Sequence, residues 1–89
     1  MTQLEFTTES AERFKNLPSH KRKQLVPILD SISNGHLKIQ HFSRIKIEDE
    51  IYYYIVRASI AVIIDFLDEN SILVVDFLTS QDFAKLRRG

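Results

Sequence analysis

The spacing of hydrophobic residues is helical in the first part of the chain. Apolar residues three positions apart predict a first helix that Thr7 or Thr8 caps and Pro18 ends. A second, amphipathic helix follows, and its apolar stripe is Leu25, Ile28, Leu29 and Ile32. Asn34-Gly35 is typical of a helix end, and we expect Pro27 to kink this helix without dividing it. Before both helices, residues 2–6 alternate weakly and predict a short strand.

Beyond His36 the period becomes that of β-strands. Residues 51–57, 60–67 and 71–78 are rich in β-branched and aromatic side chains. The connections between them are so short that they force an antiparallel meander. Residues 82–88 predict a short basic helix or tail. The pattern therefore predicts an α+β fold in one domain, residues 1–89, with two N-terminal helices packed on one face of a small, mainly antiparallel sheet of about four strands.

Alternation along the meander assigns its side chains to two sheet faces. We place Tyr52, Tyr54 and Val56 with Val62, Ile64 and Phe66 under the helices, and Tyr53, Ile55 and Arg57 with Ala61, Ile63 and Asp65 on the other face. This second face is largely apolar, which is unusual for a sheet with helices on one side only. We expect a protein partner to cover it, with Tyr53, Ile55, Ile63 and Phe83 as binding residues. Alternatively, the C-terminal segment with Phe83 and Leu86 folds back over part of it.

Charge and composition limit the chemistry. Twelve basic residues balance twelve acidic ones, so any binding of nucleic acid depends on a local patch. The chain has no cysteine and shows no signal peptide or membrane span, from which we expect a cytoplasmic protein. The three histidines lack the spacing of a metal site, and the two glycines form no phosphate-binding loop. We therefore expect no metal and no cofactor.

Several segments resemble the RelE/ParE toxins of type II toxin–antitoxin systems. They are Phe14 to Pro18 followed by Lys21 and Lys23, then residues 54–57, 60–70 and 73–76. The resemblance covers nearly the whole chain and is one of element order and pattern. It implies the fold described above, a cognate antitoxin as partner, and the ribosome with its mRNA, or DNA gyrase, as target.

The same resemblance implies that the residues for RNA cleavage are largely missing. Members that cut mRNA place lysines on the first meander strand, an arginine on the second, and an arginine followed by a tyrosine after the last. Here these positions fall on Tyr53 and Ile55, on Ala61, and near Ser80 and Phe83. Arg57 alone is kept, and one arginine makes a weak active site for phosphodiester cleavage.

Three basic sets are candidates for binding or chemistry. Arg57 with Lys46 and Arg44, which lie on the strand before the meander, forms a relocated catalytic set. Lys21, Arg22 and Lys23 at a helix start, and Lys85, Arg87 and Arg88 in the tail, are candidates for contact with nucleic acid. Each set also has a purely structural interpretation: charges that block aggregation at a sheet edge, a solvated helix face, or a solubilising tail.

Three functions remain open at this point. We favour the toxin component of a toxin–antitoxin pair, which binds its antitoxin and lacks most RNA-cleaving residues. The second is an active ribosome-dependent mRNA endoribonuclease with the relocated basic site, so the sequence leaves open whether the protein is an enzyme. The third is a non-toxic homodimer on the same fold.

Overall fold

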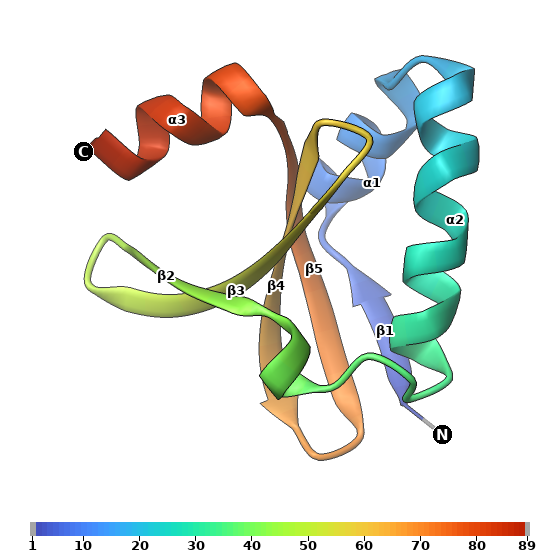
Figure 1. Cartoon of the computed structure of the whole chain (residues 1–89). Coiled ribbons are helices and arrows are strands. Elements are labelled where there is room, and N and C mark those ends of the chain that lie inside the picture. The colour runs from blue at the N-terminus through green and yellow to red at the C-terminus, as the bar shows by residue number, and fades with distance from the viewer. Residues whose placement is uncertain (1, 89) are drawn as a thin grey trace.

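The structure is a computed structural model that describes residues 2–88, with the side chains of residues 2–86. Within that range a five-stranded sheet is flanked by three α-helices (Figure 1). The elements are β1 (Gln3–Phe6), α1 (Thr8–Asn16), α2 (Ser19–Ser33), the 3-10 turn η1 (Ile39–His41), β2 (Ser43–Ile47), β3 (Glu50–Arg57), β4 (Ile60–Asp68), β5 (Ser71–Thr79) and α3 (Ser80–Arg88).

The strand order is β1-β5-β4-β3-β2. Strand β1 pairs in parallel with β5, and the other pairs are antiparallel. The predicted α+β class is confirmed, but the predicted counts are wrong. A fifth strand exists because residues 43–47 pair with β3, and the C-terminal segment is a third helix.

Local signals in the sequence explain where the helices begin and end. The Thr7 side chain accepts a hydrogen bond from the Ser10 backbone N–H at 2.9 Å and caps α1. Helix α2 is a single helix that runs through Pro27, as expected. It ends at Ser33 with Asn34 as its C-cap, and Gly35 follows with a φ of +77°, a conformation that glycine adopts without steric cost.

The pairing of β3 with β4 corrects the predicted faces of β3. The two-residue turn after Arg57 pairs it with Ile60, so each odd-numbered residue of β3 lies opposite an even-numbered residue of β4. Tyr53 and Ile55 consequently pack into the core under the helices, and Tyr52 and Tyr54 lie on the second face. The predicted faces of β4 are confirmed, and those of β3 were inverted.

Two hydrophobic clusters lie on opposite sides of the sheet. The larger cluster, between the sheet and helices α1 and α2, contains Leu25, Ile32, Val62, Ile64, Val74 and Phe77. The smaller cluster, on the second face, contains Ala61, Ile63, Leu78 and Phe83, with Leu86 packed against it. Phe83 and Leu86 belong to α3, so the alternative in which the C-terminal segment folds back over the second face is confirmed. None of the described helices has both the length and the apolar character needed to cross a bilayer.

Candidate partner-binding groove

A groove opens on the second face between α3 and the hairpin of β2 and β3, which stand on either side of it in Figure 1. Its volume is about 480 Å³. Most of its lining is apolar, and the lining residues are Ile47, Tyr52, Ile63, Val75, Asp76, Leu78, Asp82, Lys85 and Leu86. A second hollow of about 550 Å³ lies between α1 and β5, where Glu9, Glu12 and Arg13 make its lining more charged. The apolar groove is therefore the better candidate for binding another polypeptide.

Helix α3 is fixed over the second face mainly by its first half. The Thr79 hydroxyl accepts a hydrogen bond from the Asp82 N–H at 3.2 Å, and the Ser80 hydroxyl donates one to the Ser59 carbonyl at 3.1 Å. The ring of Phe83 lies 4.6 Å from that of Tyr54, measured between centroids. These contacts set the distance between α3 and the sheet and so create one wall of the groove.

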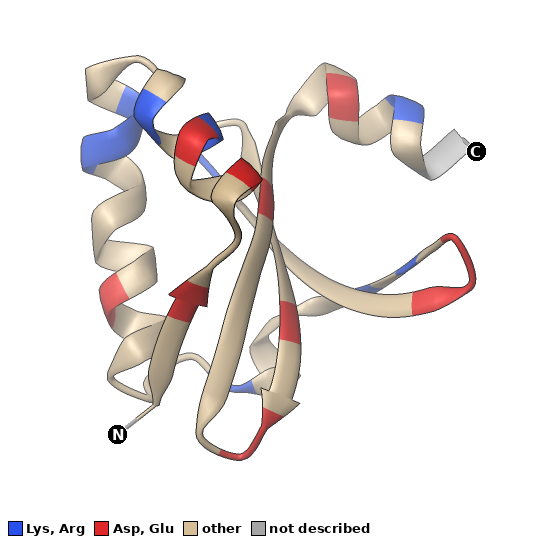
Figure 2. Cartoon of the chain, turned by 180° about the vertical axis from the view of Figure 1, so that it is seen from behind, with Lys and Arg blue, Asp and Glu red and all other residues tan. Residues whose placement is uncertain are grey.

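The opposite wall is the β2–β3 hairpin. Its tip is the acidic sequence Glu48, Asp49 and Glu50, red in Figure 2. The Tyr52 hydroxyl donates a hydrogen bond to Glu50 Oε2 at 2.9 Å. That hydrogen bond first, then burial and the negative charge of Glu50, raise the pKa of Tyr52 above its ordinary value. Tyr52 is therefore a neutral hydrogen-bond donor at the groove.

Asp76 is the partly buried carboxylate of the groove. Its Oδ1 accepts a hydrogen bond from the Phe77 N–H at 2.8 Å and lies 3.3 Å from Arg13 Nε. Burial is the main cause that raises the pKa of Asp76, and the charges of Glu9 and Asp82 raise it further. The Phe77 hydrogen bond and Arg13 act in the opposite direction without cancelling the increase.

We expect Asp76→Asn to become more stable relative to the wild type as the pH rises. A carboxyl whose pKa is higher in the folded than in the unfolded protein stabilises the fold below the unfolded value, here 3.8, and loses this contribution as the pH rises through the folded value. Asparagine keeps an acceptor for the Phe77 N–H but carries no charge. Urea denaturation of both proteins from acidic to neutral pH measures the difference in their free energies of unfolding. Asp30→Asn is the matched control, because Asp30 is exposed on α2. A difference that shrinks with rising pH would contradict the expected sign.

The structure places Arg44, Lys46 and Arg57 on one sheet face but does not bring them together. Arg44 lies opposite Tyr53, so its Cα is about 13 Å along the strands from that of Arg57. Lys46 is farther away and forms an exposed ion pair with Asp49 at 3.8 Å. All three lie on the face of Tyr53, opposite the groove. Their spacing does not form one site around a scissile phosphate.

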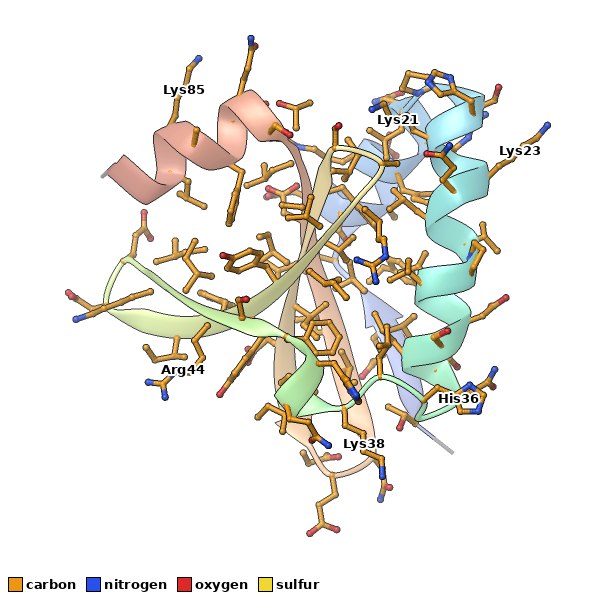
Figure 3. All side chains as sticks on the ribbon, in the orientation of Figure 1. Lys21, Lys23, His36, Lys38, Arg44 and Lys85 are labelled. Carbon is orange, nitrogen blue, oxygen red and sulfur yellow. The ribbon has the colours of Figure 1, made fainter. Side chains whose placement is uncertain are left out.

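Two of the three predicted cations at the start of α2 bind backbone carbonyls. Lys21 Nζ donates to the Ala58 carbonyl at 2.6 Å, and an Arg22 nitrogen donates to the Lys15 carbonyl at 2.6 Å. Lys23 is exposed and points away from the sheet in Figure 3. In the C-terminal set, Lys85 borders the groove, and the side chains of Arg87 and Arg88 lie outside the described residues.

The predicted partner-binding residues are only partly in the groove. Tyr53 is on the other face, where its ring meets that of Phe66 edge-on at 5.0 Å, and Ile55 lies on that face too. Ile63 and Phe83 belong to the second face but are only 1% and 7% exposed, so they support the groove more than they offer contact area. Sequence reasoning missed Ile47 and Tyr52. The registers of two two-residue turns, at residues 48–49 and 58–59, place them there.

The corrected register changes which tyrosines lie on the second face. Tyr52 and Tyr54 now share the second face with Ala61, in place of Tyr53 and Ile55. Among the described residues that line the groove, Lys85 is the one cation. The described part of the chain also contains no cluster of histidine, aspartate and glutamate able to hold a metal ion.

Comparisons with known proteins leave the resemblance untested. No protein-family model matches the chain, and searches of curated proteins and of solved structures each gave no match.

Proposed function

We propose that the chain is the toxin component of a type II toxin–antitoxin pair of the RelE/ParE kind, and that its principal activity is to bind a cognate antitoxin. The observation that carries the proposal is the apolar groove on the second face. Element order supports it as well: one strand, two helices, an antiparallel set of strands and a C-terminal helix. Under this proposal an extended or helical segment of the antitoxin inserts apolar side chains between α3 and the hairpin.

The groove offers partly exposed apolar side chains on both walls. Ile47 and Tyr52 on the hairpin and Leu86 on α3 are each half-buried, so a partner can still cover the rest of their surface. Their burial is favourable because it removes apolar area from water. The floor beneath them is already packed, so the groove needs no rearrangement of the core to accept a segment.

We expect Leu86→Glu to weaken binding of the antitoxin by at least about 30-fold, the loss typical of a residue at the centre of an interface. The partner to test is the product of any small gene adjacent to the coding sequence, co-expressed and co-purified, with affinity measured by calorimetry. Val26→Glu is the matched control, because Val26 is 45% exposed on α2, a helix that does not line the groove. This control should bind like the wild type.

The proposal also predicts growth arrest when the chain is expressed alone, and rescue by the adjacent gene product. A monomer with no such partner and no effect on growth would overturn it. So would a homodimer that Leu86→Glu dissociates without any effect on growth, because a second copy would then be the natural occupant of the groove.

A further inference from the structure

Strand β2 is an edge of the sheet, because its one neighbour in the strand order is β3. An edge strand presents backbone N–H and C=O groups that can pair with another extended chain. This edge adjoins the groove, since Ile47 of β2 is one of the lining residues. A segment bound along β2 would therefore also reach the apolar groove.

The side chains of β2 alternate in chemistry between the two faces. Arg44 and Lys46 are exposed on the face of Tyr53, whereas Ile45 and Ile47 are half-buried and pack against the second-face cluster. In Figure 3 Arg44 points away from α3 and hence from the groove. The Lys46–Asp49 ion pair is 3.8 Å long, with side chains 64% and 97% exposed, so it does little to prevent Lys46 from binding another carboxylate.

This alternation disfavours pairing between two copies of β2. An antiparallel pair with its two-fold axis at Ile45 would place Arg44 of each copy opposite Lys46 of the other. Like charges directly opposite each other on neighbouring strands are destabilising, and edge lysines commonly prevent such self-association. Acidic residues at the same positions would instead form favourable cross-strand pairs.

We infer that the β2 edge binds an extended segment of the antitoxin in which acidic and apolar residues alternate, as a sixth strand of the sheet. The acidic side chains lie beside Arg44 and Lys46, and the apolar ones lie beside Ile45 and Ile47 and enter the groove. The inference rests on the proposed function, because it specifies the segment by which the antitoxin binds. Backbone pairing supplies affinity, and the alternation supplies register and selectivity.

A synthetic peptide of alternating glutamate and valine, long enough to span β2, tests this inference with the full chain. At saturating peptide we expect hydrogen exchange at the β2 amides that face the edge to slow by at least about tenfold, measured by NMR. The same peptide with lysine in place of glutamate, or with N-methylated backbone amides, should give no such protection. Arg44→Glu/Lys46→Glu should weaken binding at least about fivefold, because two favourable cross-strand pairs become repulsive.

The matched control is Lys15→Glu/Lys23→Glu, which makes the same change in net charge on exposed positions of α1 and α2. Equal binding losses in both double variants would overturn the inference, because the effect would then be one of overall charge. Peptide protection limited to residues around Leu86, absence of binding, or peptide-independent self-association through β2 would also overturn it.

The adjacent-gene antitoxin separates this inference from the proposed function. If it binds and neutralises the protein while the β2 amides exchange as fast as in the free protein, the strand inference fails and the proposed function stands. If no antitoxin binds and growth is unaffected, the proposed function itself fails, whatever the peptide does.

Discussion

Replacement of Phe77 by alanine should lower the free energy of unfolding by about 3 to 5 kcal/mol. Phe77 is 2% exposed, and its ring centroid lies 5.2 Å from that of Phe14 and 6.5 Å from that of Phe6. The ring therefore packs α1 and β1 against β5. Its removal leaves a cavity between these three elements, and their other contacts limit how far they can move to fill it. For a small domain the loss is a large part of the total stability. Urea denaturation followed by circular dichroism measures it.

Phe6→Ala is the matched control for this prediction. It removes the same ring from the same aromatic group, but Phe6 is 42% exposed, so less apolar area returns to water and a smaller cavity forms. We expect a clearly smaller loss of stability than for Phe77→Ala. Equal losses would mean that β5 does not pack against α1 as described.

The elements themselves could be predicted from sequence because each has its own strong local pattern. The apolar stripe of α2 and the β-branched runs of β4 and β5 leave little choice of secondary structure, and their observed bounds are within a few residues of the predicted ones. The predicted count of about four strands was one too low. Asp49 and Glu50 interrupt the alternation of residues 44–48, and their charges alone do not identify a hairpin turn. Glu48 and Asp49 instead have φ values of 50° and 70° and form the turn between β2 and β3.

The faces of β3 were predicted wrongly for a reason of parity. A two-residue loop pairs residues whose numbers have an odd sum, so even positions of one strand share a face with odd positions of the next. The turn residues Ala58 and Ser59 have φ values of 55° and 62°, which glycine or asparagine usually supplies. Because that signal is absent, the length of the loop is the one feature of the sequence that indicates this register.

The groove could not be predicted because it depends on tertiary arrangement. A register shift in the β4–β5 pairing between Ile63 and Ile64 changes the course of β5 beside the groove, where Val75 is a lining residue. The position of α3 depends on contacts with residues far away in sequence, such as Ser80 with Ser59 and Phe83 with Tyr54. An apolar second face was visible in the alternation, but the walls that turn it into a groove were not.

Messenger RNA in a translation reaction should remain uncleaved even at high concentration of the protein. Cleavage requires a base for the 2′-hydroxyl, cations for the phosphorane and an acid for the leaving 5′-oxygen. The second face offers Tyr52, Tyr54, Ala61 and Phe83, none of which is a cation. Loss of one charge-stabilising donor typically lowers a rate by about 10² to 10³, and several are absent among the described residues of this face.

Primer extension on a reporter message, with an RNA-cleaving toxin of the RelE kind as positive control, measures the outcome. Cleavage at defined codons would contradict the prediction, provided that Arg57→Ala abolishes it, since contaminating nucleases are insensitive to that substitution. Arg57 is the appropriate residue because it lies on the face opposite the groove, where an Arg57 nitrogen donates to the Val56 carbonyl at 2.9 Å. If cleavage depends on Arg57, the active surface lies on the helix-covered side of the sheet, which also carries Arg44 and Lys46. Such a result would favour the relocated endoribonuclease, and the groove would then serve binding alone.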